Sequence, residues 1–414
     1  MKQTARVPFL SLPFEWTPSM LREGALALLA LNRLLLGEGY CTSDGYPSRI
    51  IFDGITPVCL DESSVIRLPE NQSWPGLEGF KNTWLSALLL FGKGRVEVAR
   101  AMLRDLSGGM TSHLQDSFLT RAAFCESERG WRNACQTLLN SRLGAKEKLR
   151  QNAERQLWRQ ERNRQLKAGK GLQWTIAELE RLETQIRALR FPQRRSTWSK
   201  YSQIGLDTDL DYDGTVDSLN AAAQSTPKAR SVKTILDRLR PRTVLDIACN
   251  RGFFCQLASR QGARACGIDI DETSLERFYA DSKRIGTSAT PLCVNAVAPA
   301  TPPHLVDRPC LHSTERLAAE CVFVFAFLHH LCVGSTRLSL DRALAIVSRY
   351  ASRYLVVEFV PEDDERLLSA YPQPSPFYNK THFVTAATDK FTLIDIFASH
   401  PGNRELYLLQ KSTG

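Results

Sequence analysis

The second half of the chain repeats a strand-then-helix pattern, and this pattern constrains the fold more than any other feature. Short apolar stretches typical of β-strands run from residue 243 to residue 411, as "TVLDIA", "ARACGIDI", "ATPLCVNA", "ECVFVFAF", "RYLVVEFV", "FTLIDIFA" and "ELYLLQK". Helices are predicted between several of them, over 253–261, 273–284 and 339–350. This succession is typical of a parallel α/β sheet with helices on both faces. Ligands bind to such sheets beyond the carboxyl ends of the strands.

The first half lacks this alternation. A strongly apolar helix is predicted over 17–36, with Thr17 as its N-cap and Pro18 at its first position. The stretches "SRIIFDG" and "ITPVCLDE" then predict two strands joined by a turn at Asp53 and Gly54. Further helices are expected over 81–105, 113–140 and 176–190. The first half is therefore predicted to be mainly helical, with some α+β character.

The length and the composition favour more than one domain. A chain of 414 residues with 43% apolar residues is long for a single domain and can bury a sizeable core. Pro192, a basic run and an Asp-rich stretch interrupt the pattern near 190–215. We therefore expect an accessory domain at 1–140, a basic helical connector at 141–195 and an α/β domain at 196–414.

The net charge of +9 comes mostly from the connector. Between Arg142 and Lys170 there are ten Lys or Arg residues and three Glu. Because this stretch has loose helical spacing, it predicts a solvated basic helix. RNA binding is the minor alternative, since single-strand readers usually present several aromatic side chains and only Trp158 stands here.

The remaining composition indicates a soluble, cytoplasmic protein. Pro8 and Pro13 break the N-terminal stretch before any run that resembles a signal peptide, and no stretch has the roughly 18 apolar residues of a membrane span. The eleven cysteines form no C-x-x-C pair, which predicts reduced thiols without a disulfide or a metal site. Cys249 and Cys255 flank one loop and are expected to be packing residues.

The loop in "VLDIACNRGFF" is the first candidate binding element. A dinucleotide site needs G-x-G-x-x-G, so that the pyrophosphate rests on the helix N-terminus. Here Ala248, Asn250 and Gly252 stand at alternate positions and only one of them is glycine. NAD is therefore disfavoured, whereas these residues suffice for the close approach of an adenosyl or amino-acid group.

The ends of the next two predicted strands supply further ligand contacts. Asp269 follows the loop by about twenty residues, where an acidic side chain can accept both hydroxyls of a ribose. Asp271 either shares that role or, with Thr273, caps the following helix, which we favour. Asn295, at the end of the third strand, either reads an adenine edge or is a turn residue before Pro299.

Catalytic candidates follow the fourth and fifth strands. His329 and His330 stand just past the end of "VFVFAF", where a histidine can act as a general base near neutral pH. A structural role is the alternative, and of the two we favour His330 as the base. Glu358, near the end of the fifth strand, is a candidate to bind or orient an acceptor.

Together these stretches resemble a class I S-adenosylmethionine (SAM)-dependent methyltransferase over about 195–412. "VLDIACNRGFF" resembles motif I, "GIDID" motif II and "FAFLHHL" the motif after the fourth strand, in the right order and spacing. More narrowly, "WSKY", "CNRGFF", "FLHHL" and "LVVEFVPED" resemble the bacterial NoeA-like (nodulation protein) methyltransferase group.

This resemblance implies a Rossmann-like sheet of seven strands with the last one antiparallel, and SAM as the cofactor. It implies Asp246 and Gly252 near the methionine part and Asp269 on the ribose. The remaining cofactor-binding residues that it implies are Tyr201, Ala248, Cys249, Asn250, Phe253, Ile270, Asn295 and Ala296. Most members of the family have glycine where Ala248 stands.

A fainter resemblance links "SDGYPSRIIFDGITPVCLD" to the catalytic-loop and metal-binding stretch of kinase-like folds. Asp44 would take the place of the catalytic aspartate and Asp61 that of the metal-binding aspartate. Arg49 stands where the family has a metal-binding asparagine, and a cation there argues against Mg²⁺ and phosphoryl transfer. A non-catalytic or substrate-shaping domain is expected, with a plain accessory fold as the equal alternative.

The functional prediction is methyl transfer from SAM to a small-molecule or saccharide-like acceptor of secondary metabolism. Two alternatives stay open. In the first, a nucleophile attacks the aminobutyryl carbon of SAM, which releases methylthioadenosine by cyclisation or aminocarboxypropyl transfer. In the second, the chain is an RNA-binding modification factor that uses its basic connector. No membrane partner is expected, and the sequence does not predict an oligomeric state.

Overall fold

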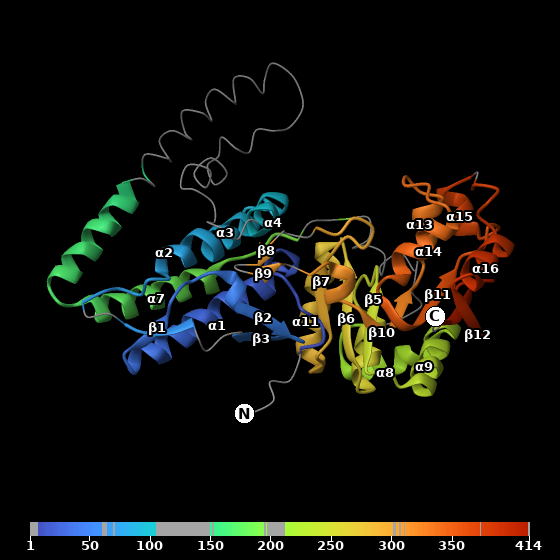
Figure 1. Cartoon of the computed structure of the whole chain (residues 1–414), viewed down its shortest axis with the longest axis horizontal. Helices are drawn as coiled ribbons and strands as arrows, with labels where there is room; N and C mark the ends of the chain where they lie inside the picture. The colour runs from blue at the N-terminus through green and yellow to red at the C-terminus, as the bar shows by residue number, and fades with distance from the viewer. Residues whose placement is uncertain are drawn as a thin grey trace, which may run out of the picture.

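A seven-stranded sheet forms the second half of the protein, as the strand pattern predicted (Figure 1). The structure is a computed structural model that describes residues 7–59, 64–68, 71–104, 150, 153–193, 196, 212–300, 304–305, 308–309, 311–372 and 374–412. The strands are β5 (Thr243–Ile247), β6 (Arg264–Asp269), β7 (Thr290–Cys293), β10 (Ala319–Val324), β11 (Ala351–Phe359), β12 (Phe391–Ala398) and β13 (Glu405–Lys411).

The order across the sheet is β12-β13-β11-β10-β5-β6-β7. The neighbours β11, β10, β5, β6 and β7 pair in parallel, whereas β13 is antiparallel to both β11 and β12. This is a Rossmann-like α/β sheet of seven strands with the last one antiparallel, so the predicted sheet architecture is confirmed. The strand order reverses between β5 and β10, and that reversal marks the expected ligand crevice.

Side chains alternate between two cores along the central strands. Leu245 of β5 and Val322 of β10 belong to one buried cluster, whereas their neighbours Val244 and Phe323 belong to the other. Successive side chains of a strand point to opposite faces. Both faces are therefore buried, which explains why these strands read as continuous apolar runs.

Helices cover the two faces. The helices of this half are α8 (Val216–Ser225), α9 (Pro227–Leu239), α10 (Phe253–Arg260), α11 (Glu272–Ile285), α12 (Ser313–Arg316), α13 (Leu328–Cys332), α14 (Leu340–Ser348), α15 (Glu365–Ala370) and α16 (Lys380–Thr388). Helices α8, α9 and α10 pack on the face that includes Val244, whereas α14 and α16 pack on the face that includes Leu245. Between β7 and α12 lies a two-stranded ribbon of β8 (His304–Leu305) and β9 (Arg308–Pro309).

The N-terminal half is mainly helical with short strand pairs, as expected. Its elements are η1 (Pro13–Glu15), α1 (Pro18–Gly37), β1 (Tyr40–Thr42), η2 (Pro47–Arg49), β2 (Ile50–Asp53), β3 (Thr56–Cys59), β4 (Val65–Arg67), α2 (Leu77–Phe80), a π-helical segment (Lys81–Leu85), α3 (Ser86–Gly92), α4 (Val96–Arg104) and α7 (Gly171–Ala188). Strands β2 and β3 form the predicted hairpin, and Gly54 has a positive φ of 67° in its turn.

The two halves share one hydrophobic core. Trp16 and Phe52 of the first half belong to the same buried cluster as Leu245 and Tyr279 of the second, and the rings of Phe52 and Tyr279 are 6.5 Å apart. An ion pair between Arg316 and Glu15 joins the halves with both side chains almost fully buried. The domain boundaries expected from the sequence stay a prediction.

Most predicted helices form, with shifted ends. The helix expected over 81–105 is interrupted between α3 and α4, where Gly94 has a positive φ of 71°. The helix expected over 176–190 begins earlier, at Gly171. The helix expected over 113–140 lies outside the described residues. Among the helices in the described part of the chain, none combines the length and the apolarity that a bilayer crossing requires.

Candidate functional site

The loop between β5 and α10 has an unusual backbone. Ala248, Asn250 and Gly252 all have positive φ angles, of 62°, 48° and 71°. This left-handed conformation strains any residue with a β-carbon, which explains why glycine is preferred at such positions. At Gly252 a β-carbon would also lie 2.4 Å from the Phe278 ring. The alternating spacing noted in the sequence therefore corresponds to a tight turn at the strand end, in which the Ala248 and Cys249 N–H groups donate to the Ile268 carbonyl.

Asp269 ties this loop to the end of β6. Its carboxylate accepts N–H hydrogen bonds from Asn250 at 2.7 Å, Ile270 at 2.7 Å and Asp271 at 2.9 Å. Burial raises the pKa of Asp269, and these three N–H groups oppose that effect. The next side chain, Ile270, is 63% exposed. An acidic group and an exposed apolar side chain thus stand together at the strand end.

Asp271 caps α11, as favoured from the sequence. Its carboxylate accepts the Thr273 N–H at 3.2 Å and the Ser274 hydroxyl at 2.8 Å. Ser196, from the segment that precedes the α/β half, donates its hydroxyl to the same carboxylate at 2.7 Å. Asp271 therefore orders the segment directly after Asp269.

The remaining residues of the loop are packed. Asp246 is 3% exposed at the end of β5 and accepts the Cys255 thiol at 3.9 Å. Phe253 is 8% exposed, and its ring lies 5.4 Å from that of Tyr212. Burial raises the pKa of both Cys249 and Cys255 well above the usual value, so both stay protonated thiols, in keeping with their expected packing role. The described residues include no group of three or more side chains placed to hold a metal ion.

Asn295 takes the turn role, one of its two interpretations. Its side-chain oxygen accepts the N–H groups of Val297 at 3.0 Å and Ala298 at 3.2 Å. The neighbouring Ala296 is 8% exposed, and its carbonyl accepts the Tyr350 hydroxyl at 3.5 Å. Tyr201, the remaining cofactor-binding candidate, lies outside the described residues.

His329 and His330 both stand in α13, directly after β10. Their ring centroids are 3.9 Å apart, and the Nδ1 atom of His330 lies 3.5 Å from the Tyr371 hydroxyl. Burial and, next, the charge of Arg404 lower the pKa of His330 to about 4. Burial also lowers the pKa of His329 well below its usual value, and its buried Nδ1 has no hydrogen-bond partner in the described part of the chain. Both rings are therefore neutral near pH 7.

Glu358 does not lie where an acceptor would reach it. The side chain is 1% exposed, and its carboxylate accepts the Lys228 ammonium at 2.9 Å and the Ser399 hydroxyl at 2.6 Å. A carboxylate committed to two buried donors is not available to orient an acceptor. The role expected from the sequence fails because Lys228 of α9, distant in sequence, packs behind the end of β11.

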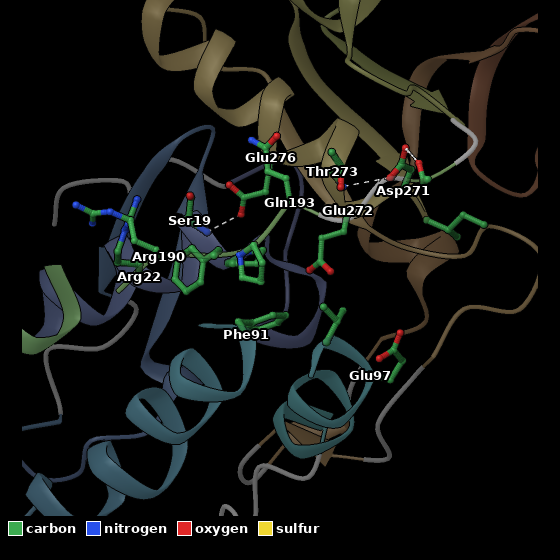
Figure 2. Close-up of a pocket in the computed structure, with 16 residues that line it drawn as sticks. Ser19, Arg22, Phe91, Glu97, Arg190, Gln193, Asp271, Glu272, Thr273 and Glu276 are labelled. Carbon is green, nitrogen blue, oxygen red and sulfur yellow. Dashed lines mark hydrogen bonds between the residues drawn. The ribbon is translucent and has the colours of Figure 1, made fainter. Parts of the chain in front are cut away.

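A cavity of about 470 Å³ lies beside the Asp269 loop, between the two halves of the molecule (Figure 2). One wall is built from the N-terminal end of α11, with Asp271, Glu272 and Glu276. The opposite wall comes from the N-terminal half and includes Ser19 of α1 and Phe91 of α3. The loop that Asp269 orders is therefore in contact with both halves.

The kinase-like stretch contains an internal ion pair. Arg49 donates from Nε at 2.9 Å and from Nη2 at 2.7 Å to the Asp44 carboxylate. This geometry pairs the aspartate that would serve phosphoryl transfer with a cation, and the non-catalytic role of this region stays a prediction. Asp61 lies outside the described residues.

Trp158, the aromatic side chain of the basic stretch 142–170, contacts other residues of the protein. Trp158 donates its indole N–H to Glu178 at 2.9 Å, and its ring lies 5.3 Å from that of Trp174. The Lys81 ammonium stands 3.7 Å from the centre of the same ring. Trp158 is therefore packed onto the N-terminal half and not presented as a stacking platform for bases.

Several charged residues near the strand ends could not be identified as site residues from the sequence. Arg404, before β13, forms a buried ion pair with Asp364, and both charges act on His329. Arg100 of α4 forms a largely buried ion pair with Glu272. Isolated charged residues carry no motif. The one signal in the sequence is the position of Arg100 on the apolar face of the amphipathic helix α4.

No family model matches the chain. The chain is similar to nodulation protein NoeA of Rhizobium meliloti strain 1021, with 25% identity over 416 residues that cover 97% of this chain and 80% of that protein. This similarity agrees with the narrower resemblance seen in the motifs.

Solved structures that are similar to the chain each cover between 44% and 50% of it. Magnesium protoporphyrin IX methyltransferase from Synechocystis PCC 6803, with bound SAH, has 15% identity and a TM-score of 0.33 over 44% of this chain and 81% of its own. The PH0226 protein from Pyrococcus horikoshii OT3 has 16% identity and a TM-score of 0.36 over 50% of this chain and 96% of its own. A TehB-like SAM-dependent methyltransferase from Corynebacterium glutamicum has 14% identity and a TM-score of 0.32 over 46% of this chain and 92% of its own.

Proposed function

We propose that the protein is a SAM-dependent methyltransferase that acts on a small-molecule or saccharide-like acceptor of secondary metabolism in the cytoplasm. The observation that carries this proposal is the junction of β5 and β6. There Ala248, Asn250 and Gly252 form a left-handed turn, and Asp269 accepts the Asn250 N–H beside it. A turn with one glycine suits a ligand without a pyrophosphate, and an acidic group at this strand end suits a ribose.

The cofactor would lie across the ends of β5 and β6. Asp269 would accept the ribose hydroxyls, and the exposed Ile270 would pack on the adenine. The backbone of Ala248 and Gly252, with Asp246 behind it, would face the methionine part. SAM supplies an electrophilic methyl group on a sulfonium, so the residues of this chain have to bind and orient the cofactor and exclude water.

Methyl transfer is an in-line displacement. The acceptor nucleophile forms a bond to the methyl carbon while the carbon–sulfur bond breaks, and S-adenosylhomocysteine leaves. Holding the nucleophile, the carbon and the sulfur in line supplies about 7–11 kcal/mol of the barrier reduction. The rigid loop around Asp269 serves this orientation.

His330 would accept the proton that the acceptor loses. It stands after β10, the strand beside β5, and its lowered pKa keeps the ring neutral at physiological pH, so that it can accept a proton as a weaker base than a histidine with the usual pKa. Tyr371, 3.5 Å from its Nδ1, can orient the ring. His329, more buried beside it, would support the geometry.

The deciding experiment combines binding with analysis of the products. Calorimetry with SAM is expected to show one site for each chain. Incubation of the protein with methyl-labelled SAM and a metabolite extract is expected to give labelled acceptor together with S-adenosylhomocysteine. Methylthioadenosine as the product would replace methyl transfer with attack on the aminobutyryl carbon. Absence of SAM binding would refute the proposal as a whole.

A further inference from the structure

Helix α11 links the short segment from Asp269 to Asp271 to the N-terminal half. It begins at Glu272, three residues after Asp269, and it lies between the two halves of the molecule (Figure 1). In its last turn Lys283 donates to Glu23 of α1 at 2.6 Å. In its first two turns two carboxylates, those of Glu272 and Glu276, also bind residues of the N-terminal half.

Arg100 makes the contact nearest to the loop. It is 8% exposed and donates to the Phe14 carbonyl at 2.5 Å, to the Trp16 carbonyl at 3.3 Å and to the Glu272 carboxylate. The Phe91 ring lies 5.6 Å from its guanidinium carbon. Two backbone carbonyls thus fix the direction of the guanidinium, and the guanidinium fixes Glu272.

A second contact holds the next turn of the same helix face. The Ser19 N–H at the start of α1 donates to the Glu276 carboxylate at 2.7 Å, as drawn in Figure 2. Glu272 and Glu276 are four residues apart and therefore lie on one face of α11. Both carboxylates line the cavity wall that the N-terminal half closes.

We propose that Arg100 is a positioning residue for cofactor binding. By holding Glu272 it fixes the N-terminus of α11, and through the short segment from Asp269 to Asp271 it fixes the carboxylate that would bind the ribose. Arg100 then sets the affinity for the cofactor without touching it. This inference rests on the proposed function.

The physical basis is the precision that the ribose contact needs. Asp269 can accept hydrogen bonds from both ribose hydroxyls only while the hydrogen bonds that it accepts from the Ile270 and Asp271 N–H groups hold the loop in place. Supporting residues that lock a binding group within about 0.5 Å decide its affinity. Loss of the Arg100 contact frees the helix end that anchors this loop.

The test replaces Arg100 by Met and measures SAM affinity by calorimetry at a temperature well below unfolding. The dissociation constant is expected to rise about tenfold, which corresponds to about 1.4 kcal/mol. The turnover rate at saturating SAM is expected to stay within about twofold, because the reacting groups are untouched. The matched control is Lys283→Met, which removes another ion pair between α11 and the N-terminal half, at the far end of the helix, and is expected to leave SAM affinity unchanged.

A purely structural role predicts a different result. It would lower the melting temperature in Arg100→Met and leave the dissociation constant for SAM as in the wild type, which would overturn the inference. Should Arg100→Met not fold, Glu272→Gln removes the same charge contact and decides in its place. If the wild type itself bound no SAM, the proposed function would fail first. Equal weakening in the Lys283→Met control would also overturn the specific role of Arg100.

Discussion

The two ends of the candidate site are built in opposite ways. At the β5–β6 end the polar groups come from neighbouring positions in the sequence, and Asp269 binds backbone N–H groups of its own loop and of the loop beside it. At the β10–β11 end the polar groups depend on distant partners, such as Lys228 for Glu358 and Arg404 for Asp364.

Under the proposed function, this difference would separate binding from chemistry. At the β5–β6 end the hydrogen bond from the Asn250 N–H to Asp269 holds the strained loop and the acidic group together. At the β10–β11 end, burial and the charge of Arg404 lower the pKa values of His329 and His330 and keep both rings neutral. Substitutions at the first end should therefore alter SAM affinity, and substitutions at the second should alter turnover or stability.

The largest expected effect is at the cofactor end. Asp269→Ala removes the ribose acceptor and the partner of three N–H groups, and SAM binding should weaken by about a thousandfold or more, or roughly 4 kcal/mol. Calorimetry measures this directly. Asp237→Ala, on the exposed face of α9, is the control and should bind SAM normally. Unchanged affinity in Asp269→Ala would remove this residue from the site.

At the other end, His330→Asn should separate binding from turnover. The loss of a general base typically costs about 10²–10⁴-fold in rate, whereas SAM affinity should stay as in the wild type. Single-turnover kinetics with labelled SAM measures the step. A variant with normal turnover would assign the proton to another group, such as His329.

Lys228→Met tests whether Glu358 is structural. It leaves a buried carboxylate without its cation, and the free energy of unfolding should fall by about 3–5 kcal/mol. The double variant Lys228→Met and Glu358→Leu should recover much of this loss and keep acceptor turnover. A double variant that is stable but has lost its affinity for the acceptor would restore the acceptor role of Glu358.

Stability should depend on pH through the histidine pair. The pKa of His330 is lowered from 6.5 to about 4 in the folded state, so the unfolded state binds more protons below pH 6.5. The free energy of unfolding should therefore be highest above pH 6.5 and fall by about 2 kcal/mol on the way to pH 5. Urea unfolding at several pH values measures this fall, and His330→Asn should reduce it while the exposed control His382→Asn should not.

The smallest effect concerns the strained loop. Ala248→Gly removes the strain of a left-handed alanine, which stabilises the folded state, and gives the unfolded chain more conformational freedom, which opposes that gain. The first effect should be larger, so the free energy of unfolding should rise by about 0.5 kcal/mol. The matched substitution Ala345→Gly, in α14, should cost about 1 kcal/mol instead. Urea unfolding distinguishes the two signs. Destabilisation by both would show that the loop is not strained at Ala248.

The sequence predicted the sheet because burial on both faces leaves a strong local signal. All seven strands were placed, and Asp269 and the loop residues Ala248, Asn250 and Gly252 could be selected as candidates because they follow strands that are close together along the chain. The left-handed backbone of Ala248 and Asn250 was not predicted. The buried ion pair of Glu358 could not be predicted, because no residue near it in the sequence indicates that Lys228 of α9 is its partner. The contact of Arg100 with Glu272 was equally hidden, since it joins two elements 172 residues apart.

The shared core also determines how the protein unfolds and whether it can be divided into stable fragments. Trp16 and Phe52 belong to the same cluster as the sheet residues Leu245 and Ile268, so part of one sheet face has its cover in the first half of the chain. A fragment that begins after the connector would expose that apolar face to water and would be prone to aggregate. Heating the full chain should accordingly give one cooperative transition instead of two.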